Sequence, residues 1–120
     1  MDYKKLDAWS LTMELVVDVY KITKLYPKEE LYALTSQTKR AAISIPANIA
    51  EGIGRNYKKD TIQFLHIARG SLYELDTLLY LAIQVEILNK VETERVLIKL
   101  EKCKQVINGL INYYEKSNLK

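Results

Sequence analysis

The chain has 120 residues, of which 48% are hydrophobic and 28% charged, with a formal net charge of +3. These values favour one folded domain, 1-120, and exclude an intrinsically disordered chain, because disorder needs low hydrophobicity. A net charge of +3 is only a weak sign of a polyanion partner, and the single cysteine excludes an intrachain disulfide.

Hydrophobic residues recur every three or four positions along nearly the whole chain, which predicts helices throughout. The first helix is expected over 7-25. It should end before Pro27, because proline disfavours the helical conformation of the preceding residue and cannot donate a hydrogen bond. The second is expected over 29-54, with Gly52 and Gly54 marking its end.

The third helix is expected over 57-88, with Asn56 as its N-cap. The fourth is expected over 91-115, after Asn89 and Glu92, which have the spacing of a capping box. Short connections force antiparallel neighbours. The sequence therefore predicts an all-α fold, an antiparallel up-down-up-down four-helix bundle.

The second predicted helix contains a proline and a stripe of polar residues. Pro46 lies in its interior, so we expect a kink there. Two interpretations of the stripe remain open: a polar seam that fixes the register of the second helix on the third, with Arg40 near Glu74 and Ser44 near Ser71, or a partner-facing surface. The stripe consists of Gln37, Arg40, Ser44, Asn48, Glu51 and Arg55.

No constellation of residues indicates catalysis. The only histidine, His66, has no nucleophile or orienting carboxylate on its helix face, and Cys103 lies on the apolar row of the fourth helix. One histidine and one cysteine cannot make a zinc site, and phosphate-loop and nucleophile-elbow motifs are absent. We therefore expect no enzyme activity, no cofactor and no metal.

Charge is unevenly distributed, because residues 89-120 carry seven basic and four acidic groups. This excess indicates either a solvated helix face or a surface that faces phosphates. The N-terminus lacks an apolar signal core, and no apolar run reaches transmembrane length. We expect a cytoplasmic protein that has no membrane partner.

Two blocks of sequence carry a family resemblance: LTSQTKRAAISIPANIAEGIGR, and further on FLHIARGSLYELDTLL. Over about residues 5-115 the chain resembles the bacterial four-helix-bundle proteins encoded in intervening sequences of 23S rRNA genes. It is also similar to the accessory variability protein of diversity-generating retroelements, a basic pentameric barrel that binds nucleic acid and a reverse transcriptase. The matching motif positions are Arg40, Ser44, Pro46, Asn48, Glu51, Gly52, Arg55, Gly70, Ser71 and Glu74.

The resemblance implies a non-enzymatic homo-oligomer, a pentamer first of all, with a role linked to nucleic acid. RNA, DNA or a protein partner would then contact a set of basic residues near one edge of the bundle. The alternative is a protein-interaction scaffold without nucleic-acid binding, and a toxin–antitoxin-like or small-ligand bundle is a third hypothesis. The candidate contacts are Lys39, Arg40, Arg55, Lys58 and Lys59.

Overall fold

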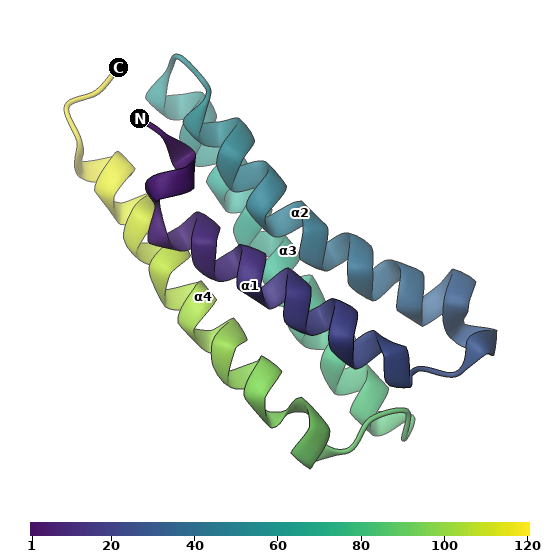
Figure 1. The fold of residues 1–120 in the computed structure, drawn as a ribbon. Helices are drawn as coiled ribbons and strands as arrows, with labels where there is room; N and C mark the ends of the chain where they lie inside the picture. The colour runs from purple at the N-terminus through teal and green to yellow at the C-terminus, as the bar shows by residue number, and fades with distance from the viewer.

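Four long helices make up most of the chain in the computed structural model, which describes all 120 residues (Figure 1). There are no strands, so the all-α four-helix fold predicted from the apolar spacing is confirmed. None of the helices combines the length and the hydrophobicity that crossing a bilayer requires. The helices are α1 (Asp7–Ile22), α2 (Ser36–Ile53), α3 (Lys58–Gln84) and α4 (Lys90–Lys116).

Each helix packs against the next one in the chain, and α4 closes the bundle by packing against α1 (Figure 1). Side-chain bonds give the direction of neighbouring helices, because the residue number falls along one helix as it rises along the other. The α2–α3 pairs are Gln37–Glu74, Ser44–Ser71 and Gly52–Thr61, and the α3–α4 pairs are Arg69–Asn108 and Asp76–Lys104. Both of these helix pairs are therefore antiparallel.

The connection between α1 and α2 remains helical on both sides of Pro27. A 3-10 turn, Thr23–Leu25, follows α1, and Tyr26 then takes an extended conformation with ψ of 142°, as a residue before proline prefers. A second 3-10 turn (Lys28–Glu30) and a π-helical turn (Leu31–Thr35) lead into α2. The predicted second helix thus exists, but only its part from residue 36 is α-helical.

The ends of α3 differ from the prediction. Tyr57, rather than Asn56, is the N-cap, and no side chain caps this end. At the other end α3 stops at Gln84, four residues before the predicted 88, because Glu86 has a left-handed φ of 63°. At α4 the predicted capping box is confirmed: the Asn89 side chain accepts from the Glu92 N–H at 2.8 Å, and the Glu92 carboxylate accepts from the Asn89 N–H at 3.0 Å.

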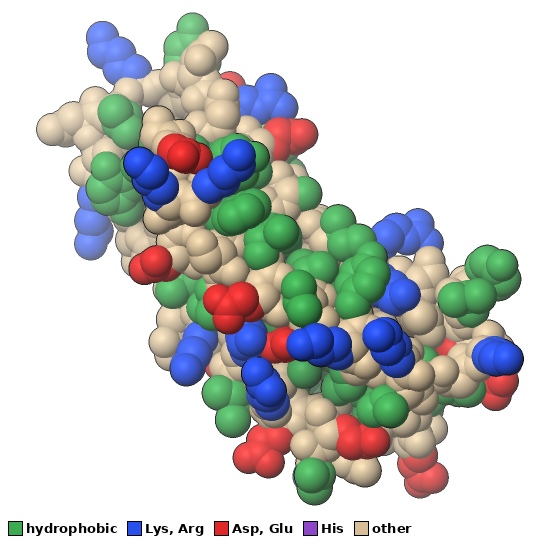
Figure 2. All heavy atoms as spheres, in the orientation of Figure 1, with side chains coloured by type: hydrophobic (Ala, Val, Ile, Leu, Met, Phe, Trp, Pro, Cys, Tyr) green, Lys and Arg blue, Asp and Glu red, His purple; other side chains and the backbone are tan.

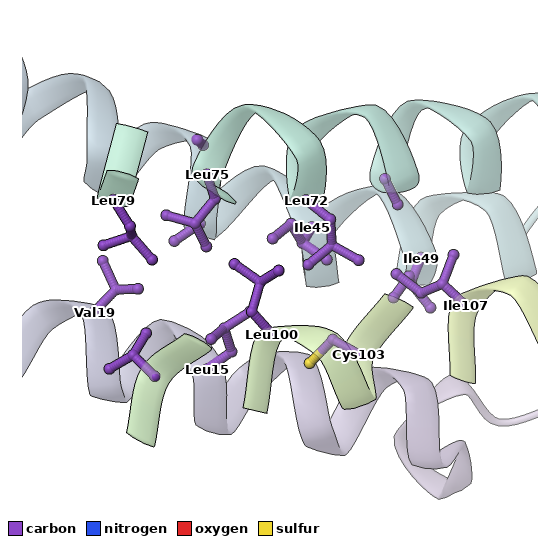
Figure 3. Close-up of a cluster of buried hydrophobic side chains, with 14 of the residues drawn as sticks. Leu15, Val19, Ile45, Ile49, Leu72, Leu75, Leu79, Leu100, Cys103 and Ile107 are labelled. Atoms are coloured by element: carbon purple, nitrogen blue, oxygen red, sulfur yellow. The ribbon is translucent and has the colours of Figure 1, made fainter. Parts of the chain in front are cut away.

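The core consists of aliphatic side chains from all four helices, as Figure 3 shows for its central part. Cys103 belongs to this cluster and has no exposed surface, which confirms its place on the apolar row of the fourth helix. Burial raises the pKa of the Cys103 thiol to about 12, so it is an unreactive neutral thiol at neutral pH. The labelled residues are Leu15, Val19, Ile45, Ile49, Leu72, Leu75, Leu79, Leu100, Cys103 and Ile107.

Two residues of the α2 motif have packing roles. Pro46 is buried inside α2, and a bend of the helix at this residue stays a prediction. Gly52 lies where α2 comes closest to α3: a Cβ atom there would stand 2.8 Å from the Phe64 Cβ and 3.2 Å from the Thr61 carbonyl oxygen. A larger residue at position 52 would therefore push the two helices apart.

We predict opposite effects for two glycine-to-alanine substitutions. Gly52→Ala should lower the free energy of unfolding by about 1 kcal/mol, because overpacking costs about 1–3 kcal/mol and better helix propensity returns about 1 kcal/mol. Gly70→Ala is the matched control, since a Cβ at position 70 meets nothing within 4 Å. It should raise the stability by about 1 kcal/mol. Urea unfolding followed by circular dichroism measures both changes, and equal effects at the two positions would contradict the packing role of Gly52.

Candidate functional site

The middle of the polar stripe on α2 is hydrogen-bonded to α3. The hydroxyl oxygens of Ser44 and Ser71 lie 2.8 Å apart, and both residues are half-buried. The Asn48 amide donates to the Ser44 carbonyl oxygen at 2.7 Å and to its hydroxyl at 2.9 Å. These residues use their polar groups within the protein, so this part of the stripe acts as a seam between two helices.

Arg40, at the next turn of the stripe, lies near Glu74 as the register-fixing interpretation expected, but it forms no ion pair with it. The Glu74 carboxylate instead accepts from the Gln37 amide at 3.0 Å, while the Arg40 guanidinium donates to the Ser36 hydroxyl at 3.2 Å. Arg40 and Glu74 line one polar hollow of about 270 Å³ between α2 and α3. Arg40 therefore stays exposed, with donor groups left for a partner.

Three further basic residues of the candidate set lie near the α2–α3 turn: Arg55, Lys58 and Lys59. They differ in the contacts that they make with the rest of the protein. Arg55 forms an ion pair with Glu51 at 3.7 Å, and its guanidinium lies 4.6 Å from the centre of the Phe64 ring. The Lys58 ammonium donates to the Ser117 carbonyl oxygen at 3.2 Å, so the end of the chain occupies it. Lys59 is exposed and makes no bond to the protein.

The five candidate contacts follow α2 and the turn after it, but they are not close together. Arg55, Lys58 and Lys59 surround the turn between α2 and α3, whereas Lys39 and Arg40 lie near the beginning of α2. From Arg40 to the end of α2 at Ile53 are thirteen helical steps, which amount to about 20 Å at 1.5 Å per residue, and Arg55 lies just beyond. The predicted set therefore divides into two groups near opposite ends of α2.

Two of the seven basic residues in 89-120, Lys99 and Lys104, form ion pairs within the bundle. The Lys99 ammonium lies 2.7 Å from Asp18 and 3.6 Å from Glu14 on α1. The hydrogen bond to Asp18 raises the pKa of Lys99 against the opposing effect of burial. This lysine joins α4 to α1 and is not available to phosphates.

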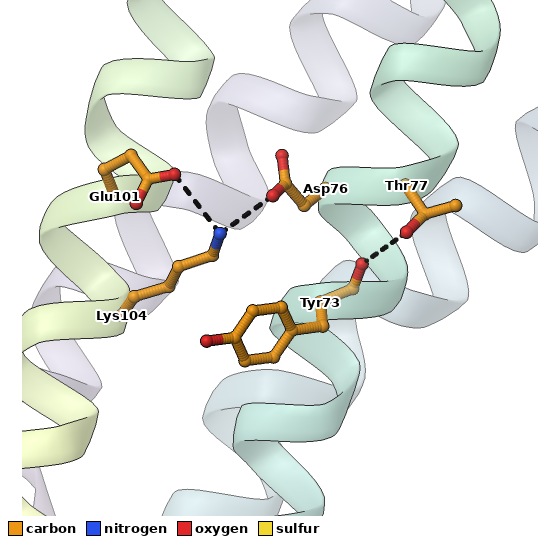
Figure 4. A network of polar contacts seen from close by, with 5 residues as sticks. All are labelled: Tyr73, Asp76, Thr77, Glu101 and Lys104. Carbon is orange, nitrogen blue, oxygen red and sulfur yellow. Dashed lines mark hydrogen bonds and ion pairs between the residues drawn. The ribbon is translucent and has the colours of Figure 1, made fainter.

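Lys104 makes the equivalent connection from α4 to α3 (Figure 4). Its ammonium lies 2.8 Å from Asp76 and 3.2 Å from Glu101, and 4.7 Å from the centre of the Tyr73 ring. Burial alone would lower the pKa of Lys104, but its hydrogen bonds to Asp76 and Glu101 outweigh that effect and raise it. Neither interpretation of the C-terminal charge, a solvated face or a phosphate-facing surface, describes Lys99 and Lys104, which form ion pairs between helices.

Two apolar grooves lie on opposite faces of the bundle, because α1 and α2 form one face and α3 and α4 the other. Figure 2 shows the apolar band along α1 and α2. The α1/α2 groove, of about 320 Å³, is lined by Tyr3, Trp9, Met13, Val16, Ile43, Pro46, Ala47 and Ala50. The α3/α4 groove, of about 520 Å³, is lined by Tyr80, Ile83, Lys90, Val91, Glu94, Leu97, Ile98 and Glu101.

A third feature is a hollow of about 220 Å³ at the corner where the chain turns from α1 into α2. Lys24, Lys28 and Lys39 line it together with Tyr20 and other uncharged residues, and no acidic side chain does. Sequence reasoning selected Lys39 but missed Lys24 and Lys28. The only sign of this site in the sequence was the position of Lys24 and Lys28 on either side of Pro27. Spacing alone does not show that the chain brings Lys39 back toward Lys24 and Lys28.

The single histidine does not take part in an acid–base arrangement. The His66 ring accepts from the Arg69 guanidinium at 2.9 Å, and Arg69 also donates to Asn108 at 3.1 Å. No group of three or more His, Cys, Asp or Glu side chains is placed to hold a metal ion. These polar contacts join α3 to α4 and are structural in kind.

Comparisons with known proteins agree with this architecture. One solved structure that the chain resembles is a protein of unknown function from the S23 ribosomal protein family of Bacteroides thetaiotaomicron. The two share 22% sequence identity, with a TM-score of 0.79 over 87% of this chain and 97% of the other, which shows a common fold. A search of curated proteins finds no significant match.

A family model also matches the chain over most of its length. The model of the 23S rRNA-intervening sequence protein family matches residues 4–109, which include all four helices except the end of α4. Both blocks of sequence that carried the resemblance lie inside this range, so the family suggested by those residues is confirmed. The chain belongs to the 23S rRNA-intervening sequence protein family.

Proposed function

We propose that this protein is a non-enzymatic, self-associating helical bundle that binds nucleic acid. The observation that carries the proposal is the pair of apolar grooves on opposite faces of the bundle. A water-soluble monomer rarely exposes large contiguous apolar surfaces, and those that exist mark interaction sites. Each groove is bordered by exposed large side chains, of which Val91 is the extreme case at 82% exposure.

Opposite faces favour a particular kind of assembly. Two different surfaces that fit each other form a head-to-tail contact, and repeating that contact closes a ring when the rotation between copies allows it. The α1/α2 groove of one copy would receive the α3/α4 surface of the next. A ring of five copies is our expectation for the assembly, on the strength of the family resemblance.

The nucleic-acid half of the proposal rests on the exposed basic residues. Arg40, Arg55 and Lys59 are all exposed, and Arg40 and Lys59 have no ion pair. Repetition of such groups around an oligomer would multiply a modest net charge of +3 per chain. The second candidate function is a protein-interaction scaffold without nucleic-acid binding, which the apolar grooves alone would favour.

Self-association is tested by one substitution on each face, Met13→Lys in the α1/α2 groove and Ile98→Lys in the α3/α4 groove. Both side chains are exposed, at 40% and 53%, so the fold should persist. Light scattering at micromolar concentration should show an oligomer for the unaltered chain and monomers for each variant. An equimolar mixture of the variants should form dimers, because each retains one intact surface.

Gln63→Lys, on the exposed polar side of α3, is the control and should leave the oligomer intact. A monomeric unaltered chain would refute self-association. An oligomer that survives Ile98→Lys but not Met13→Lys would indicate instead a symmetric contact between two α1/α2 faces.

Nucleic-acid binding is tested by a gel-shift titration with structured RNA at 50 and 200 mM salt. With three phosphate contacts, affinity should fall about 40-fold between these concentrations, since the slope of log affinity against log salt is about −0.9 per contact. Replacing Arg40, Arg55 and Lys59 by Gln should weaken binding and flatten the salt dependence. The control replaces Lys102, Lys116 and Lys120 by Gln, which removes the same charge elsewhere. An oligomer that binds no RNA at low salt would support the scaffold function instead.

A further inference from the structure

We propose that the hollow between α1 and α2 is a binding site for a phosphate group, with Lys24, Lys28 and Lys39 as its cationic contacts. The candidate contacts chosen from the sequence included Lys39 but not Lys24 or Lys28, so they did not identify this site. Its extension to nucleic acid rests on the proposed function, but the site itself does not. The chemistry that it recognises is a phosphate oxyanion, carried by a nucleic-acid backbone or by a free phosphate compound.

The three lysines converge because of the helical connection between α1 and α2. Lys24 belongs to the 3-10 turn after α1, and Lys28 begins the next turn, just after the chain is redirected at Pro27. Lys39 comes from the first turn of α2 and lies against the end of α1, where its ammonium is 4.7 Å from the centre of the Tyr20 ring. Three separate segments thus bring positive charge to one hollow.

No carboxylate pairs with these lysines, of which Lys24 and Lys28 are exposed and Lys39 is half-buried. Lys99 and Lys104 each contact two carboxylates, whereas none of the three lysines in the hollow forms an ion pair. The nearest acidic residues in sequence, Glu29 and Glu30, do not line the hollow. Neighbouring like charges repel one another, so an anion bound among the three lysines would stabilise their arrangement.

The hollow also offers a neutral donor and enough space. Thr35 is only 6% exposed, lines the hollow, and its hydroxyl takes part in none of the hydrogen bonds within the protein. The volume of about 220 Å³ is about seven times that of a water molecule in the liquid, which admits a phosphate group with part of its water shell. Lysine ammonium groups bind phosphate as point charges, without the planar geometry that carboxylates prefer with arginine.

The site lies beyond one end of the apolar groove between α1 and α2. Lys and Arg side chains gather on the same face as the band, toward the end of the bundle where α1 stops (Figure 2). The groove between α1 and α2 extends from Tyr3 and Trp9 to Val16 and Ile43, and the hollow begins beyond it at Tyr20. The hollow and the groove share no residue, so an assembly that covers the groove leaves the lysines a separate surface.

The test is an NMR titration of the full chain with inorganic phosphate at constant ionic strength, with chloride as the balancing anion. The amide signals of residues 20-39 should shift in a saturable way. Replacing Lys24, Lys28 and Lys39 together by Gln should weaken phosphate binding at least about tenfold, because charge-assisted hydrogen bonds are lost. Lys39→Arg, which retains the charge, should keep the binding. The matched control again replaces Lys102, Lys116 and Lys120 by Gln.

The outcomes separate the site from the proposed function. Signals that do not saturate, or equal weakening in the lysine variant and its control, would overturn the phosphate site. If phosphate binds as expected, adding the structured RNA decides the source. Displacement of phosphate by RNA supports a backbone phosphate as the natural ligand. Binding of phosphate without displacement supports the site for a free phosphate compound, and the gel-shift titration with the Arg40, Arg55 and Lys59 variant then decides the nucleic-acid half of the proposed function by itself.

Discussion

The close contact between α2 and α3 is the constraint on which the rest of the bundle depends. Gly52 has no side chain to separate the helices, and the Thr61 hydroxyl donates to its carbonyl oxygen at 2.7 Å. Further along, the serine pair Ser44–Ser71 repeats the close approach with a hydrogen bond between two small side chains. Small residues set the distance and the hydrogen bonds set the register. A shift of one turn along α3 would lose these bonds and place Phe64 against larger residues than Gly52.

This register also determines where charge can remain unpaired. With α3 in place, Asp76 on its other side meets Lys104 of α4 (Figure 4). Lys99 reaches Asp18 of α1. Partly buried ammonium groups need such partners, because desolvation without compensation is costly. The lysines at the α1–α2 corner lie outside these contacts. The bundle therefore leaves positive charge concentrated at one corner, although the net charge of the chain is small.

The apolar grooves follow from the same square arrangement of helices. A helix in a four-helix bundle needs only one apolar stripe, which faces the core. Here the helices also carry large apolar side chains that are exposed, outside that stripe. On α1 and α2 the excess lies on one face, and on α3 and α4 it lies on the opposite face. The polar seam between α2 and α3 and the ion pairs of Lys99 with α1 occupy the edges between these faces, whereas the Lys104–Asp76 pair joins α3 to α4 beside the second groove. Glu101, which pairs with Lys104 and also lines the α3/α4 groove, connects an internal polar contact with a proposed partner surface.

The sequence by itself determined the number of helices, the break at Pro27, the capping box at Asn89 and the core position of Cys103, because these follow from local periodicity and backbone chemistry. It also predicted the Ser44–Ser71 contact, since an antiparallel hairpin relates residues by simple counting. Only the tertiary structure decided which lysines are neutralised, because Lys104 meets Asp76 across 28 residues of sequence. Gly52 and Gly70 look alike in sequence, yet one lies against Phe64 and the other faces open space. Such differences arise from side chains of other helices, and no local pattern records them.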